Sequence, residues 1–407
     1  MLSSSNKKRV ASVLAATGLC ASLMVGSSAS ADPAQYVALV GVGSDTTQDV
    51  LNGFAGRSLD RFFTPVVSSS ATGVQQIISF DALGAGSLLG DCIVLKPGGG
   101  AFERPNGSGN GREALSRAID VSPANRWGGA GCGLQDISGN VDFARSSSGP
   151  GTGTSTVLTF IPFGRDAVGF ASYRANGAAV TSLTRAQINT AFTSGSVTVG
   201  GVKIIPCAIQ DGSGTFQFWN TRHGATPAQE ISSTAVCRGT GAGSQPLGRL
   251  QENNGVELKA AGDAVAALAG ESGTQVIIGF SAGAFVAKGN GVALPAHPVG
   301  VTMGSITDDS LTGGGANLGN PVSGTAPNLT PSTTFFQSAI FGRDVYNVLP
   351  STVVDASIPN ALQSLFRGSG SAVCQATGTI QTFGFLPLTT GCGSITLRGP
   401  ASAGTTN

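Results

Sequence analysis

Short polar turns rich in glycine, serine and threonine occur at four places in the sequence. They are residues 43–47 (GSDTT), 106–109 (NGSG), 145–148 (RSSS) and 211–215 (DGSGT). Hydroxyl groups and the free N–H groups at the start of a helix donate hydrogen bonds, and the helix dipole adds partial positive charge there. A single turn of this kind is typical of an ordinary helix cap. Four turns brought to one place would bind a dehydrated oxyanion.

The elements around these turns are expected to bring them together. Strands predicted at 36–42, 141–144 and 202–209 lead into three of the turns, and helices predicted at 47–55 and 112–118 follow two of them. Ligands of open α/β sheets bind beyond the carboxyl ends of the strands, which is where the turns lie. Further strands are predicted at 92–95, 157–161, 167–173 and 275–280, and further helices at 185–192, 263–269 and 360–366. This alternation predicts an α/β fold.

Composition excludes several classes of protein. Only 11% of the 407 residues are charged, and 61 are glycine without a collagen repeat, so neither a disordered chain nor a collagen is indicated. Two stretches dense in small polar residues, 97–111 and 307–334, are expected to be irregular insertions. The length favours two lobes over one.

The first 31 residues have the pattern of a secretory signal. A basic head at 7–9 precedes an apolar stretch at 10–25 and the small-residue site Ala29-Ser30-Ala31. The apolar stretch is shorter than a membrane span, and no later segment is long or apolar enough. Cleavage near Ala31 predicts a protein that is secreted or held in the cell envelope. Cleavage leaves 20 basic and 22 acidic residues, so the chain lacks the excess of basic residues that is typical of nucleic-acid binding.

Six cysteines follow the predicted signal. An even number in an exported chain favours disulfides over metal ligation, and no metal site or cofactor is predicted. Fifteen connectivities are open. We favour nearest neighbours, because each pair then closes a local loop: Cys92 with Cys132, Cys207 with Cys237, and Cys374 with Cys392.

The four turns, in this order, resemble motifs of the phosphate-binding, periplasmic-type solute-binding proteins of ABC transporters. The resemblance rests on GVGSDTTQDV (41–50), RPNGSGNGREAL (104–115), VDFARSS (141–147) and QDGSGT (210–215), with support from LTRAQINTAFTSG (183–195) and IIGFSAGAFVAKGNG (277–291). It implies a two-lobed, type II periplasmic-binding-protein-like α/β fold with the ligand between the lobes. The implied ligand-binding residues are Ser44, Asp45, Thr46, Thr47, Ser108, Gly109, Arg145, Ser146, Ser147, Asp211, Ser213, Gly214 and Thr215.

Two positions depart from the family pattern. Ser147 stands where the family has an aspartate, and Ile209 stands where it has an arginine. Arg145 is expected to restore the guanidinium with bidentate geometry. Asp45 or Asp211 is expected to accept a proton from the ligand.

The resemblance also implies the organisation and the partners of the chain. Lobe one is expected at 32–160 plus 340–407 and lobe two at 161–339, with crossings near 160–163 and 339–344. The expected ligand is inorganic phosphate or a similar oxyanion. The sequence has no P-loop, so the ATPase must be a separate protein, and the expected docking partner is the membrane permease of an ABC transporter. The protein is expected to be a monomer without catalytic residues.

Two other classes of function compete with a binding protein. Residues 279–283 (GFSAG) match the nucleophile elbow of a serine hydrolase, but His223 precedes the serine and no acid lies between Ser281 and His297. The order of a catalytic triad is therefore not met. A structural or adhesin protein of the cell envelope would explain the glycine-rich loops and low charge, but not the ordered turns.

Overall fold

The computed structural model describes residues 39–68, 75–84, 91–119, 126–128, 131–226, 228–229, 237 and 249–401. The predicted signal at 1–31 and the first residues of the strand expected at 36–42 lie outside the described residues. Within the described ranges, no helix is both long and apolar enough to cross a membrane.

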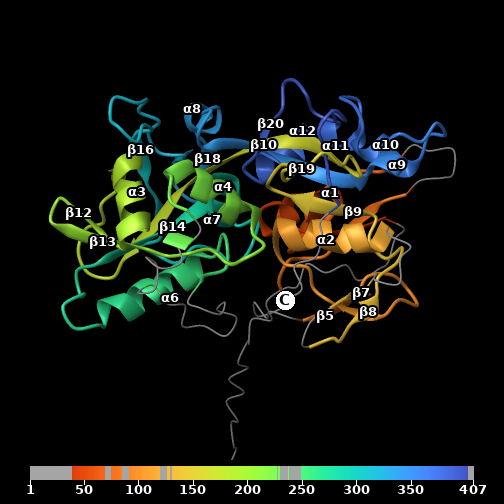
Figure 1. The fold of residues 1–407 in the computed structure, drawn as a ribbon. Coiled ribbons are helices and arrows are strands. Elements are labelled where there is room, and N and C mark those ends of the chain that lie inside the picture. Colours follow the sequence, from red (N-terminus) through yellow and green to blue (C-terminus); the bar gives the residue numbers. More distant parts are fainter. Residues whose placement is uncertain are drawn as a thin grey trace, which may run out of the picture.

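One mixed sheet runs through the molecule (Figure 1). Its central path has the order β12-β13-β14-β10-β19-β9-β1-β4, and β15 (Thr302–Met303), β20 (Leu386–Pro387) and β21 (Arg398–Gly399) also pair with β10. The strands of the path are β12 (Val197–Val199), β13 (Val202–Pro206), β14 (Gln275–Ser281), β10 (Leu158–Arg174), β19 (Gly342–Pro350), β9 (Phe143–Ser146), β1 (Leu39–Gly43) and β4 (Ile77–Ser79).

The long strands β10 and β19 join the two sides of this sheet. They pair antiparallel from Leu158 opposite Pro350 to Ala167 opposite Gly342. The prediction of separate strands at 157–161 and 167–173 is wrong, because β10 continues through both. Pro162 and Gly164 flank an irregularity in the register that the pairing accommodates.

Helices cover the sheet on each side of the crossing (Figure 1). On one side lie α1 (Gln48–Phe54) with the short 3₁₀ helix η1 (Asp45–Thr47), α2 (Gly107–Ile119), α9 (Ser351–Val354), α10 (Ala361–Phe366), α11 (Ala372–Gln375) and α12 (Thr377–Thr382). On the other lie α3 (Arg185–Ser194), α4 (Gly214–His223), α6 (Gly255–Ala266), α7 (Ala282–Gly289) and α8 (Thr333–Phe336).

The apolar side chains form separate cores on the two sides. One core surrounds Trp219 and Phe280 in the part that we call the second lobe. Two others, around Phe54 and around Phe102, lie in the part that we call the first lobe. The predicted two-lobed α/β architecture is therefore confirmed.

Two helices begin earlier than predicted. Helix α2 starts at Gly107 rather than at 112, because its first turn contains the glycines, serine and asparagine that were assigned to a loop. Helix α6 starts at Gly255 rather than at 263, and the Asn254 side chain caps it by accepting from the N–H groups of Val256 and Glu257. The first error arises because small polar residues at a helix start resemble a turn.

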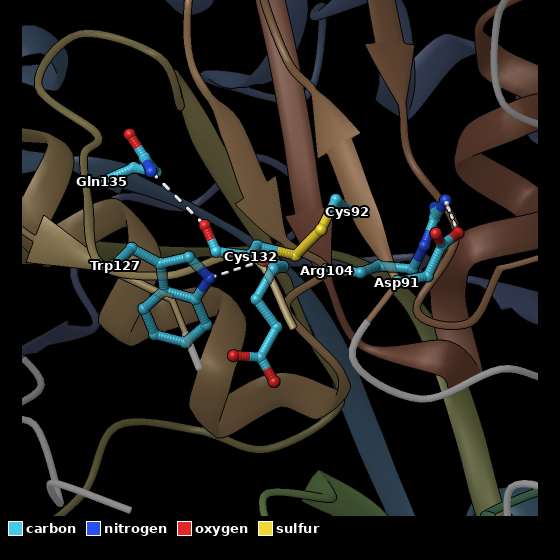
Figure 2. Close-up of a disulfide and its surroundings, with 7 residues drawn as sticks. Asp91, Cys92, Arg104, Trp127, Cys132 and Gln135 are labelled. Carbon is cyan, nitrogen blue, oxygen red and sulfur yellow. Dashed lines mark hydrogen bonds and ion pairs between the residues drawn. A yellow bond between two sulfur atoms is a disulfide. The ribbon is translucent and has the colours of Figure 1, made fainter. Parts of the chain in front are cut away.

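The nearest-neighbour pairing of the cysteines is confirmed, with disulfides Cys92–Cys132, Cys207–Cys237 and Cys374–Cys392. Figure 2 shows the first of these beside the Asp91–Arg104 ion pair. This disulfide links the hairpin of β5 (Cys92–Val94) and β6 (Ala101–Glu103) to the loop before β8 (Gln135–Asp136), which pairs with β7 (Arg126–Trp127). The hairpin leads into α2 and so helps to position the second polar turn.

The two predicted insertions differ in the structure. Residues 97–111 hold β6 and the start of α2, so that insertion is shorter than predicted. Residues 307–334 are mostly irregular, apart from the end of β16, the start of α8 and one small hairpin. The remaining short strands are β2 (Arg57–Ser58), β3 (Arg61–Phe62), β11 (Ser182–Thr184), β16 (Ser305–Asp308), β17 (Val322–Ser323) and β18 (Thr330–Pro331).

Candidate anion-binding site

The first polar turn lies at the carboxyl end of β1, where the chain enters η1 and then α1. Ser44, Asp45, Thr46 and Thr47 are all buried. Among the described residues, the hydroxyl oxygens of Ser44 and Thr47 have no hydrogen-bond partner. A buried hydroxyl without a partner is costly, so these two donors are suited to a ligand.

The second and third turns meet through two serines. Ser108 Oγ lies 3.3 Å from Ser147 Oγ and accepts a hydrogen bond from the Ser147 backbone N–H at 3.0 Å. Ser108 lies in the first turn of α2, and Ser147 follows β9. Both side chains are fully buried. The end of β9 and the start of α2 are therefore held together at one point.

The fourth turn approaches this point from the second lobe. Ser213 caps α4 by accepting from the backbone N–H groups of Thr215 and Phe216. A Cβ atom on Gly214 would lie 2.5 Å from Ser108 Oγ and 2.6 Å from Ser147 Oγ, so only glycine allows this close approach.

A further contact completes the convergence. Thr215 Oγ1 lies 3.1 Å from Thr46 Oγ1, which joins the fourth turn to the first. The four turns predicted from the sequence thus lie against one another where the lobes meet.

An ion pair that the sequence analysis missed lies in the same place. Arg343 of β19 is directly opposite Asp166 of β10, and its Nε and Nη2 donate to Asp166 Oδ2 at 3.0 and 2.9 Å. Nη2 also donates to Thr215 Oγ1 at 2.9 Å. Arg343 is 4% exposed, and among the described residues its Nη1 has no partner. It therefore supplies the site with a cation and a free donor.

Arg145 does not have the role predicted for it. Its Nε donates to the carbonyl of Ser44, Nη1 to Ser79 Oγ and the carbonyl of Gly41, and Nη2 to the carbonyl of Gly43. Since all three nitrogens are engaged, the guanidinium holds the first turn in place and offers no bidentate contact to a ligand. Burial lowers the pKa of Arg145 to about 10.

Asp211 also lies outside the buried site. Its side chain is 79% exposed and forms an ion pair with Arg249. An exposed carboxylate in an ion pair is poorly placed to accept a proton from an enclosed anion. Of the two predicted acceptors, only Asp45 is buried at the convergence of the turns.

Three other predicted donors already have protein partners. The Gly109 N–H donates to the carbonyl of Gly212 at 2.9 Å, and the hydroxyl of Ser146 donates to the carbonyl of Ser148 at 2.7 Å. The hydroxyl of Ser213 donates to Glu252 Oε2 at 2.6 Å. These residues shape the turns, whereas Ser44, Thr47 and Arg343 keep free donors.

Asn253 and Glu252 form a further side of the site that the sequence analysis missed. Asn253 has a left-handed backbone with φ of 57°, and its Nδ2 donates to Asp45 Oδ1 at 2.9 Å and to Thr46 Oγ1 at 3.1 Å. Its Oδ1 accepts from the Ser281 N–H at 2.9 Å, which fixes the orientation of the amide. Glu252 is fully buried, and burial together with the charge of Asp45 raises its pKa to about 7.

Ser281, the serine of the GFSAG motif, has a structural position. Its hydroxyl donates to Asp166 Oδ1 at 2.9 Å and accepts from the Ala284 N–H at the start of α7. His297 Nε2 lies 3.0 Å from the carbonyl of Phe285. Ser281 thus caps a helix and orients Asp166 rather than pairing with a histidine base.

The arrangement provides hydroxyl donors, helix starts and one guanidinium around a buried carboxylate. Charge-assisted and neutral donors of this kind replace the hydration of an anion. Among the described residues, no group of three or more His, Cys, Asp or Glu side chains is placed to hold a metal ion.

Comparisons with known proteins found likeness only at the level of structure. No family model matches the chain, and no curated protein matches it. A putative phosphate ABC transporter substrate-binding protein with bound phosphate from Clostridium perfringens is 11% identical, with a TM-score of 0.43 over 86% of this chain and 99% of that one. An ABC-type phosphate transport receptor from Vibrio cholerae is 11% identical, with a TM-score of 0.41 over 86% and 100%. A phosphate-binding protein from Stenotrophomonas maltophilia is 16% identical, with a TM-score of 0.40 over 87% and 91%. A likeness of this degree assigns no ligand to this chain.

Proposed function

We propose that the protein is an exported solute-binding protein that captures an inorganic oxyanion, phosphate, for an ABC transporter. The observation that carries this proposal is the set of buried donors without a partner where the four turns meet: Ser44 Oγ, Thr47 Oγ1 and Arg343 Nη1. An anion that accepts from these groups would satisfy all three.

The carboxylate of Asp45 favours phosphate over sulfate. Asp45 is 5% exposed and is held by Asn253 Nδ2. A carboxylate beside a bound anion is unfavourable unless the ligand brings a proton to share. Phosphate carries such a proton near neutral pH, and sulfate does not.

Burial favours a free inorganic anion over an ester. The side chains of Ser44, Thr47, Ser108, Ser147 and Thr215 are all 0% exposed. An organic substituent on the ligand would have to displace these contacts. The proposed binding residues are Ser44, Asp45, Thr46, Thr47, Ser108, Ser147, Gly214, Thr215 and Arg343.

We further propose that two lobes close on the anion and that a membrane permease receives it. We place lobe boundaries at 160/161 and 339/340, which the separate cores support for most residues. The exceptions lie in the segments that cross between the lobes and at the end of α7: Ile161, Phe163, Ala287, Val292 and Ala293 pack into a core of the first lobe, and Phe341 packs into the core of the second. Closure of the lobes would bury the anion. The chain would bind and deliver its ligand to a membrane permease without catalysis, as a monomer, after removal of the signal at 1–31.

A thermal unfolding series with different anions tests the proposal. Phosphate at about one hundred times its Kd should add about 2.7 kcal/mol to the free energy of unfolding. The melting temperature should therefore rise by several degrees with phosphate and much less with sulfate, nitrate or a phosphate monoester. No shift with any anion would contradict the proposal and favour a structural role in the envelope.

Ser281→Ala separates a binding protein from a hydrolase. The substitution removes one of the donors to Asp166, and the Gly283 N–H remains at 3.1 Å. We expect phosphate affinity to fall by about tenfold or less, since one hydrogen bond contributes about 1 kcal/mol. Wild-type protein should show no esterase turnover. A burst with an activated ester that Ser281→Ala abolishes would favour the hydrolase.

A further inference from the structure

Glu252 is a buried carboxyl group with one oxygen occupied and one oxygen free. Its side chain is fully buried, and Oε2 accepts from the Ser213 hydroxyl at 2.6 Å. Among the described residues, Oε1 has no hydrogen-bond partner. An ionised oxygen that is buried and unpaired is costly, whereas a protonated one becomes a donor.

The hydrogen bonds of Ser213 decide which oxygen carries the proton. A serine hydroxyl has one donor and two acceptor lone pairs. Ser213 Oγ already accepts from the N–H groups of Thr215 and Phe216, so its own proton must go to Glu252 Oε2. Oε2 is thus an acceptor in either state of Glu252. When Glu252 is neutral, its proton therefore sits on Oε1.

The groups around Glu252 belong to the anion-binding site. Asp45 of η1 raises the pKa of Glu252, while Arg343 of β19 and the hydroxyls of Ser213 and Thr215 lower it. Burial is the largest cause, and the net result is a pKa raised to about 7. The Glu252 backbone N–H donates to Gln210 Oε1, and the Ser213 hydroxyl of the fourth turn donates to its side chain, so Glu252 is held beside that turn. Bound negative charge there would favour the neutral acid still further.

We propose that Glu252 donates a hydrogen bond from Oε1 to the bound anion, so that binding at alkaline pH is linked to the uptake of one proton. This inference rests on the proposed phosphate site and adds a residue to it. Asp45 accepts the proton that the ligand brings, and Glu252 supplies a second proton from the protein side. The two carboxyl groups therefore have opposite hydrogen-bonding roles toward one ligand.

Binding of phosphate above neutral pH would take up one proton from solvent. Above neutral pH the free protein has Glu252 mostly ionised, and free phosphate is mostly the dianion with one proton. The complex holds that proton and one more on Glu252, so one proton is taken from solvent. By linkage, the affinity should fall about tenfold for each pH unit above about pH 8.

Titration calorimetry in buffers of different ionisation enthalpy measures this uptake directly. With phosphate at pH 8, we expect wild-type protein to take up about one proton and Glu252→Gln to take up close to none. The amide of glutamine keeps an acceptor for Ser213 and a permanent donor in place of Oε1. Phosphate affinity of Glu252→Gln should therefore vary little between pH 8 and pH 9.

Glu257→Gln is the matched control. Glu257 is also a buried carboxyl with a raised pKa, but its oxygens accept from the Gln251 N–H and from Asn254 Nδ2. Glu257→Gln should keep the uptake of one proton. Equal loss of uptake in both variants would overturn the assignment to Glu252.

If a variant does not fold, the proton uptake of the wild-type protein at pH 8 still tests the role of Glu252. Tight phosphate binding without proton uptake at pH 8 would overturn the role of Glu252 and leave the proposed function intact. Absence of phosphate binding at every pH would instead remove the proposed function.

Discussion

Arg343→Met is expected to weaken phosphate binding by about two to three orders of magnitude. The substitution removes the cation of the site and the free donor Nη1. It also leaves the carboxylate of Asp166, which is 0% exposed, without its ion-pair partner and close to the bound anion. Breaking a buried pair in this way costs about 3 to 5 kcal/mol, part of which appears as lost affinity. Calorimetric titration with phosphate measures the effect.

The fold should survive Arg343→Met, because Asp166 keeps the Ser281 hydroxyl and the Gly283 N–H as donors. Arg165→Met is the matched control. Arg165 directly precedes Asp166 in β10. It forms an ion pair with Asp344, but this pair is partly exposed. Its loss should change affinity by less than about fivefold, since such pairs contribute about 1 kcal/mol or less. Equal effects of the two substitutions would contradict the role of Arg343.

Asp45→Asn is expected to reduce the discrimination between phosphate and sulfate by about two orders of magnitude. The carboxylate accepts the proton of phosphate and repels an anion that has none. An amide removes this repulsion and can donate to sulfate, while its oxygen can still accept from Asn253 Nδ2. Sulfate should therefore gain affinity while phosphate loses it.

Competition between the two anions measures this change. Asp344→Asn serves as the control, because Asp344 is next to Arg343 in the chain but lies in the partly exposed pair with Arg165. Discrimination should stay at the wild-type value in the control. If Asp45→Asn kept the wild-type ratio of phosphate affinity to sulfate affinity, a group other than Asp45 would accept the proton of phosphate.

Local sequence was sufficient to predict the polar turns and most of the elements beside them. Strand β1 and helix α1 lie where the apolar run and the polar turn at 43–47 indicated, and α3 has the capping box of Thr184 and Gln187 that its sequence predicts. These features depend on residues only a few positions apart.

The charged groups of the site could not be predicted in the same way. Arg343 and Asp166 are 177 residues apart and meet only because β10 and β19 pair in one register. Arg145 was misassigned because the sequence placed it in a polar turn, whereas it lies in β9, where its guanidinium faces backbone carbonyls rather than a ligand. Asp166 directly precedes the apolar strand expected at 167–173. A charged residue next to an apolar strand, in a chain with few charges, was the signal available for it.

Glu252 and Asn253 were missed because their segment precedes a helix whose start was placed too late. With α6 beginning at Gly255, Asn254 becomes its cap and the two preceding residues enter the site. The pattern of asparagine followed three residues later by Glu257 was a usable signal for this boundary.

Calorimetric titration of the wild-type protein with phosphate and with sulfate at neutral pH measures directly whether the site where the four turns meet selects phosphate. We expect tight, saturable binding of one phosphate per chain and binding of sulfate weaker by about two orders of magnitude or more. Equal affinities for the two anions, or no heat with either, would contradict it.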